Sequence, residues 1–164
     1  MNENSAAFAY QQSSARSATP VGQVVALYDT ILRDFRRANE AQAGGVVEKR
    51  VFELNHALAV IGHLRGVLDR ERGGESAKRL ERFYEVTRAM ILQASVSDDR
   101  EAVNKLIDLY SSLRQAWLVC EKQVAAGGGS ALPAPPAVPP VVKAPQPAAN
   151  DEEELTGSRS NWSA

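Results

Sequence analysis

The 164-residue sequence has few of the features that mark secreted, membrane-spanning or nucleic-acid-binding proteins. Its single cysteine, Cys120, excludes an internal disulfide. No run approaches the roughly 20 apolar residues of a membrane-spanning helix, and the N-terminal "MNENSAAFAYQQ" lacks the basic and apolar regions of a signal peptide. A formal net charge of -1 gives no large field for gripping phosphate backbones or an anionic bilayer. We therefore expect a cytoplasmic protein with no nucleic-acid partner and no membrane insertion.

Motifs for catalysis and metal binding are also scarce. His56 and His63 share a helix face, but no cysteine or paired carboxylate joins them at ligand spacing, so we expect no metal and no cofactor. The stretch "HLRG" at 63–66 matches the phosphotransfer pattern His-x-Leu-Lys-Gly only weakly, because its glycine comes one position early. No serine or cysteine occupies a strand-turn-helix elbow. We expect a protein that is not an enzyme, with phosphotransfer at His63 as an alternative.

The composition divides the chain into three parts. Residues 1–18 form a small, polar N-terminal arm that carries one tyrosine, Tyr10. Residues 19–126 carry the apolar periodicity of a folded domain. From residue 127 the chain turns Gly/Ser-rich, then Pro/Ala-rich and finally acidic, which predicts a disordered tail over 127–164 with Trp162 as its only bulky side chain.

Four helical periods fill the central part. The first begins at Thr19 and Pro20, a typical N-cap and first helical residue, and ends near 43–45. The second spans about 46–71 and is ended by the glycine pair at 73–74. The third covers 77–94 and the fourth 103–124, with Asp98 as N-cap and Glu101 completing a capping box between them. Long helices, short turns and no alternating strand pattern predict an all-α, antiparallel four-helix bundle.

The apolar faces are wider than a closed bundle needs. Beside the main stripes, the second to fourth helices carry a further set of apolar residues: Ala57, Val60, Leu64, Val67, Phe83, Met90, Ile107 and Leu118. They could simply broaden the core, or pair two copies as a homodimer. They could also form a groove that takes an amphipathic helix from a partner, with Tyr10 lying across it while the partner is absent. The sequence leaves both interpretations open.

An ordered set of short motifs resembles the flagellar secretion chaperone family FliS. The stretch "AYQQ" followed by "ATPVGQVVALYDTIL" is similar to the family's tyrosine-glutamine arm, Ser/Thr-Pro cap and Leu-Tyr/Phe-Asp signature. Further on, "LDRERGGESAKRLERFYEV" resembles its Leu-Asp, Gly-Gly-Glu and Leu-x-x-x-Tyr sequence, and "LRQAW" its closing Trp motif. The motifs occur in the family's order over roughly 8–120.

The resemblance implies a chaperone that binds the C-terminal segment of flagellin and keeps it from polymerising before export. It implies a helical bundle whose apolar surface orders that segment, with Tyr10 as the anchor of the arm, and it leaves open whether an export-gate protein also binds. A histidine phosphotransfer bundle and a structural helical dimer are the competing functions. Two departures from the family pattern are Gly22, where an acid was expected after the first cap, and the long Pro/Ala tail.

Overall fold

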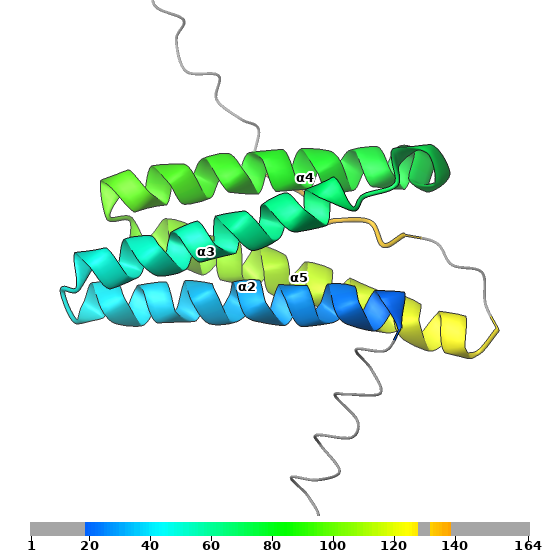
Figure 1. Cartoon of the computed structure of the whole chain (residues 1–164), viewed down its shortest axis with the longest axis horizontal. Helices are drawn as coiled ribbons and strands as arrows, with labels where there is room; N and C mark the ends of the chain where they lie inside the picture. Colours follow the sequence, from blue (N-terminus) through cyan, green and yellow to red (C-terminus); the bar gives the residue numbers. More distant parts are fainter. Residues whose placement is uncertain (1–18, 128–131, 139–164) are drawn as a thin grey trace, which may run out of the picture.

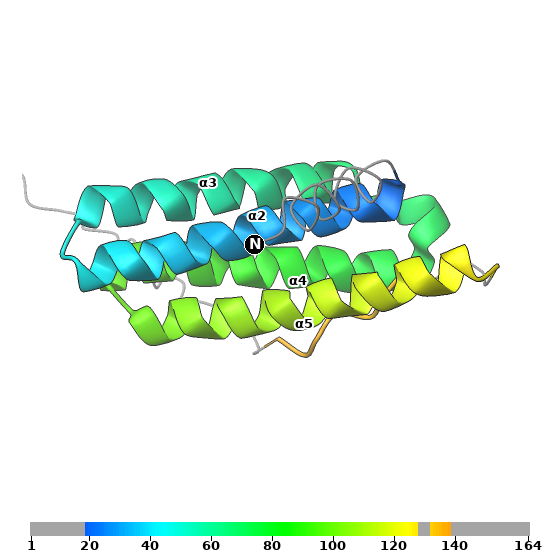
Figure 2. The ribbon, with the colours of Figure 1, turned by 90° about the horizontal axis from the view of Figure 1, so that it is seen from below.

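A computed structural model describes residues 19–127 and 132–138, and these residues form four long α-helices and no strand. The helices are α2 (Pro20–Ala43), α3 (Val47–Gly66), α4 (Arg70–Ser97) and α5 (Arg100–Ala125). Successive helices run in opposite directions and lie side by side (Figures 1 and 2). The predicted all-α, antiparallel four-helix bundle is confirmed. None of the helices in the described ranges is long and apolar enough to span a bilayer.

The start of α2 follows the sequence prediction. Thr19 is the N-cap, and its hydroxyl oxygen accepts a hydrogen bond from the backbone N–H of Gly22 at 2.9 Å. Pro20 is the first helical residue, where its missing N–H leaves no hydrogen bond unmade. The helix ends at Ala43, at the predicted boundary.

The connection between α3 and α4 differs from the prediction. Helix α3 ends at Gly66 rather than near residue 71. Asp69 then caps a new helix, because its side chain accepts from the N–H groups of Glu71 and Arg72 at 3.1 and 2.9 Å. The glycine pair at 73–74 therefore lies inside α4, where Gly74 has a non-helical φ of 50° and ψ of -130° and bends the helix.

The predicted capping box between α4 and α5 is wrong by one residue. The N-cap of α5 is Asp99, whose side chain accepts from the N–H of Ala102 at 3.0 Å. Asp98 instead ends α4 in the left-handed conformation, with φ of 54°. Its carboxylate pairs at 3.0 Å with buried Arg50, which also donates to the carbonyls of Ala94 and Ser95. Asp98 thus ties the start of α3 to the end of α4.

Aromatic rings fill the centre of the bundle. Helix α2 packs most closely against α3 and α5, and α4 stands further from its neighbours. Phe83 on α4 lies with its ring centroid 5.2 Å from that of Tyr110, which in turn contacts Phe35 and Tyr28 of α2 at 5.6 and 6.0 Å. All four side chains are buried. The large rings bridge the wider spacing on the α4 side.

Candidate partner-binding site

An open apolar cavity of about 320 Å³ lies where the start of α2, the end of α3, the bend in α4 and the end of α5 meet. These four helix ends meet at one end of the bundle because successive helices are antiparallel (Figure 1). Its walls are Val24, Leu64, Val67, Leu68, Tyr84, Trp117 and Leu132, with Asp69, Arg72 and Gly73 at the connection between α3 and α4. The lining suits apolar groups, since most of it is aliphatic or aromatic carbon.

The early end of α3 leaves one wall of this cavity exposed. Val67 follows the last helical residue of α3 and keeps 60% of its surface exposed. The neighbouring wall residues Leu64 and Trp117 are buried, at 3% and 8% exposed. Burying apolar surface yields about 25 cal/mol per Å². A partner that covers Val67 therefore gains free energy without first unpacking the core.

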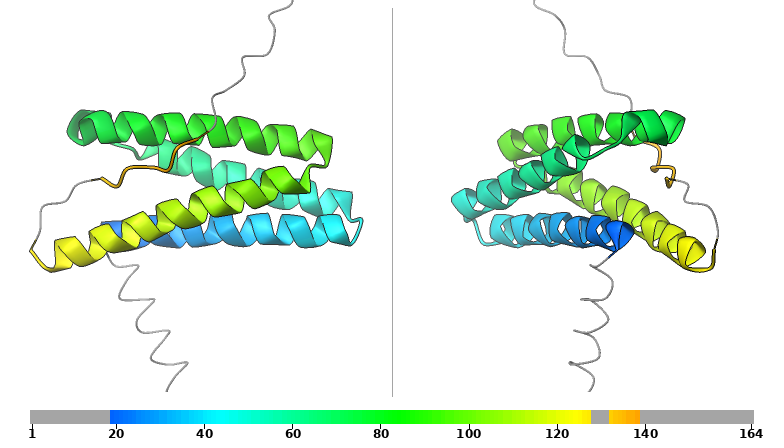
Figure 3. Two further views of the ribbon diagram at one scale, coloured as in Figure 1. Left: turned by 180° about the vertical axis from the view of Figure 1, so that it is seen from behind. Right: turned by 45° about the vertical axis from the view of Figure 1, so that its right-hand side comes forward.

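A short piece of the C-terminal tail forms the remaining wall. Residues 132–138 run back along the bundle between α4 and α5 (Figure 3). Leu132 and Val138 pack against the core, and Pro133 is buried. This placement corrects the expectation that nothing in 127–164 would pack. The rest of that range, Trp162 included, and the arm 1–18 lie outside the described residues.

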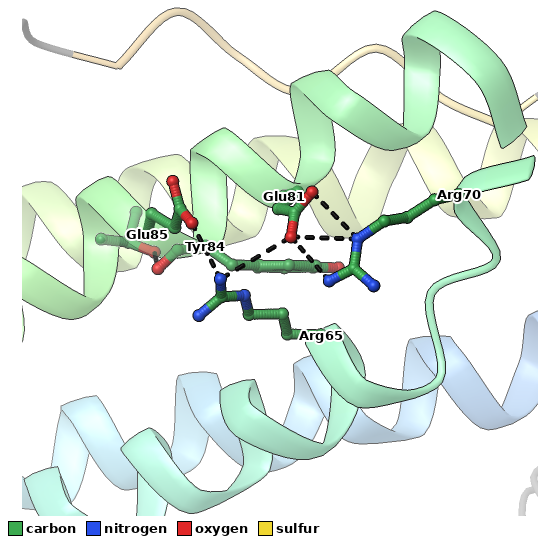
Figure 4. Close-up of polar contacts among 6 residues, drawn as sticks. Arg65, Arg70, Glu81, Tyr84 and Glu85 are labelled. Carbon is green, nitrogen blue, oxygen red and sulfur yellow. Dashed lines mark hydrogen bonds and ion pairs between the residues drawn. The ribbon is translucent and has the colours of Figure 1, made fainter.

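An ion-pair network beside the cavity fixes the connection between α3 and α4. Glu81 of α4 accepts from Arg70 at 2.6 Å and lies 3.6 Å from Arg65 of α3, and Arg65 also pairs with Glu85 at 2.8 Å (Figure 4). The hydrogen bond from the Arg70 guanidinium holds the pKa of Glu81 below its usual value. The network spans α3, the start of α4 and the part of α4 beyond its bend, next to the wall residue Tyr84.

Two pairs of hydroxyl groups lie inside the bundle behind the cavity. Tyr84 shares a hydrogen bond with Tyr28 of α2, and Tyr110 of α5 shares one of 2.9 Å with Thr87 of α4. Burial raises the pKa of Tyr84 to about 12 and that of Tyr28 well above its ordinary value. Both phenols are therefore neutral at physiological pH, and these bonds attach α4 to α2 and α5.

The residues predicted to form a groove divide into three groups. Ala57, Leu64 and Phe83 are buried in the core, so the wider apolar rows partly broaden the core, as the first interpretation held. Val60, Met90, Ile107 and Leu118 are half-buried and pack against the core edge. Val67 is exposed. Leu64 and Val67 line the cavity, the other six do not, and Tyr10 lies outside the described residues.

Several cavity residues had no signal of their own in the sequence. Tyr84 and Trp117 fit the main apolar stripes of their helices, which predicts that they lie in the closed seam. Leu132 stands in a proline-rich stretch that the composition assigned to the tail. The early end of α3 could have indicated the cavity. It could not be predicted, because the apolar pattern of the helix continues through Leu68.

The two histidines are in different environments. The Nδ1 atom of His56 lies 2.6 Å from Oδ2 of buried Asp34, which links α3 to α2. His63 is exposed on α3. In the described ranges no three His, Cys, Asp or Glu side chains are grouped to hold a metal ion.

Comparison with known proteins identifies similar chains. Residues 2–124 match the family model of the flagellar protein FliS. The flagellar secretion chaperone FliS of Campylobacter jejuni is 31% identical over 117 residues, which cover 71% of this chain and 91% of the relative. The Salmonella typhimurium chaperone of the same name is 30% identical over 107 residues, covering 65% and 79%. The FliSB chaperone of Pseudomonas aeruginosa is 34% identical over 82 residues, covering 47% and 65%.

Proposed function

Because this chain belongs to the FliS family of flagellar proteins, we propose that it is a flagellar export chaperone. It binds the C-terminal segment of flagellin in the cytoplasm, prevents premature polymerisation and aids delivery to the flagellar type III export apparatus. It acts by binding alone and catalyses no reaction.

The open apolar cavity is the observation that carries this proposal. An amphipathic helix presents apolar side chains three and four residues apart along one face. One such side chain enters between Val67, Tyr84 and Trp117, where the walls are already in place. The half-buried Val60, Met90, Ile107 and Leu118 offer further apolar contacts on α3, α4 and α5. We propose that the partner-binding residues are Val60, Val67, Met90, Ile107 and Leu118, together with Tyr10.

Binding should order the partner. A polymerising segment that is disordered when free loses conformational entropy when it forms helices, and the buried apolar area must offset that cost. The bundle is suited to this because its ion pairs and buried hydrogen bonds fix its own helices before the partner arrives. Little of the binding free energy is then used to order the chaperone.

The test is to mix the purified full chain with the C-terminal segment of flagellin and to measure particle mass by light scattering and helix content by circular dichroism. We expect a complex with more helix than the sum of the separate components. A scrambled peptide of the same composition is the control and should remain unbound. Failure to form a complex, or a complex without added helix, would contradict the proposal.

The same samples separate the competing functions. A phosphotransfer protein would incorporate acid-labile phosphate on His63 from a donor kinase, and His63→Ala would abolish the incorporation. A structural dimer would have twice the chain mass without flagellin. Exposed Phe52, Leu92 and Val96 are available for such pairing.

A further inference from the structure

The tail segment 132–138 lies against the bundle. All seven side chains are apolar, and three of the residues are proline. Leu132 and Val138 pack against the core cluster and Pro133 is buried, whereas Ala134 and Ala137 are exposed. The segment lies beyond residue 124, where the match to the family ends. It is therefore a feature of this chain outside the matched region.

The bend in α4 provides a specific seat for Leu132. A Cβ atom at Gly73 would lie 2.7 Å from Cδ1 of Leu132 and 2.5 Å from Cβ of Ala77, closer than carbon atoms approach. Glycine at this position therefore leaves room for Cβ of Ala77 within α4 and for the methyl group of Leu132. The glycine pair thus has two effects, since Gly74 bends the helix and Gly73 leaves the space that the leucine fills.

The seat and the cavity are continuous, because Leu132 also forms a wall of the cavity beside Tyr84, Trp117 and Val67. A helix that enters the cavity and continues along α4 would meet the tail segment. Without Leu132 the space above Gly73 would join the cavity and lengthen the apolar surface. The tail segment and such a partner helix would therefore compete for the same apolar surface.

Docking in cis is favoured by the chain itself. Only four residues, 128–131, separate Gly127 from Leu132, so the segment is held close to its seat. Each proline has a fixed φ, which lowers the entropy lost on docking. Because of both effects, the segment can occupy its position on the bundle most of the time even though its own contacts are weak.

We propose that the segment 132–138 is an intramolecular plug that covers part of the partner-binding surface and is displaced when the partner binds. The identity of the partner rests on the proposed function, a flagellin C-terminal segment. The plug itself rests on the contacts of Leu132 and Pro133. If it occupies its seat in about nine of ten molecules, the full chain binds its partner about tenfold more weakly than a chain whose plug is released.

The experiment compares full-length Leu132→Asp and Leu132→Ala with Ala134→Asp as the matched control. Ala134 is exposed in the same segment, so its substitution adds the same charge without disturbing the seat. Two measurements are made: the NMR signals of the Gly73 amide and the Trp117 indole N–H, and the affinity for the flagellin segment by calorimetry. We expect Leu132→Asp to shift both signals and raise affinity about tenfold, Leu132→Ala to do so less, and Ala134→Asp to do neither.

Each contrary result overturns a different statement. Unmoved Gly73 and Trp117 signals in Leu132→Asp would mean that the segment does not dock. Shifted signals with equal or weaker flagellin affinity would mean that it docks but does not compete. Shifted signals with no flagellin binding by any variant would remove the proposed function, and the competition with it, while the docking would stand.

Discussion

Tyrosine hydroxyls inside the bundle show how single polar atoms help to hold α4 in place. An unpaired hydroxyl in the interior costs about 1–3 kcal/mol, so each one needs a partner. Tyr84 and Tyr28 satisfy one another, and Thr87 satisfies Tyr110. Each hydroxyl pair links α4 to a different helix. The aromatic rings span the distance between α4 and these helices, and the hydrogen bonds between the hydroxyl groups hold α4 there. These bonds could not be predicted, because the stripes place tyrosines inward without showing which hydroxyls meet.

The Tyr84 phenol makes stability depend on pH in the alkaline range. Its folded pKa of about 12 exceeds the ordinary value near 10. The folded state therefore holds this proton more tightly, and its contribution is complete below about pH 10 and is lost as pH rises toward about 12. The free energy of unfolding therefore falls as the pH rises through this range.

Urea unfolding of Tyr84→Phe and the native chain between about pH 8 and pH 12 tests this. We expect the variant to be about 1 kcal/mol less stable at pH 8, because Tyr28 loses its partner. It should then lose less stability than the native chain at high pH, although Tyr28 and Tyr110 still contribute. Equal losses in the two proteins would show that Tyr84 does not carry this dependence.

The arm residue Tyr10 provides a second single-residue prediction. If its ring covers part of the partner surface, Tyr10→Ala should leave the thermal unfolding midpoint within about 1 °C while changing flagellin affinity at least about threefold. Calorimetric titration of the full chain measures the affinity, with Gln12→Ala in the same arm as control. Unchanged affinity would mean that the arm takes no part in binding.

At the level of helices, the start of α2 was predicted correctly, whereas the starts of α4 and α5 were misplaced. Thr19 and Pro20 fix the start of α2 because capping depends only on adjacent residues. The boundary at 98–99 was misassigned because either aspartate can cap, and the contact between Asp98 and Arg50 of another helix decides between them. The glycine pair predicts a helix end, but glycine permits both a stop and a bend, and the cap at Asp69 decides the outcome.

The bend at Gly74 yields a prediction with an internal control. Its φ of 50° and ψ of -130° are open only to glycine, and no atom outside its chain neighbours lies within 4 Å of an added Cβ. Gly74→Ala should therefore cost about 1–3 kcal/mol through backbone strain alone. Gly62→Ala, on an exposed helical position with equal space, should stabilise by about 0.5–1 kcal/mol. Urea midpoints that move in the same direction would contradict this assignment.

The described residues form a four-helix bundle with an open apolar cavity at the end where α2 starts and α5 ends. The periodicity predicted the four helices and their antiparallel order, and it indicated more apolar surface than a closed seam uses. It could not say which of those residues remain accessible, because that depends on how far α4 stands from α2 and where α3 ends. Ala57 and Phe83 are buried in the core, whereas Val67 remains exposed. The contribution of Leu132 was unpredictable because its seat is formed by a bend in a distant helix.

The most direct test of the account is the flagellin affinity of the full chain after a charge is placed in the cavity. Val67→Asp adds the charge to the exposed wall, and Val96→Asp adds it to a valine that is 88% exposed and does not line the cavity. Isothermal titration calorimetry with the flagellin C-terminal segment should show binding weakened about tenfold or more for Val67→Asp and unchanged for Val96→Asp. Equal affinity of Val67→Asp and the native chain would contradict the assignment of the cavity as the binding site.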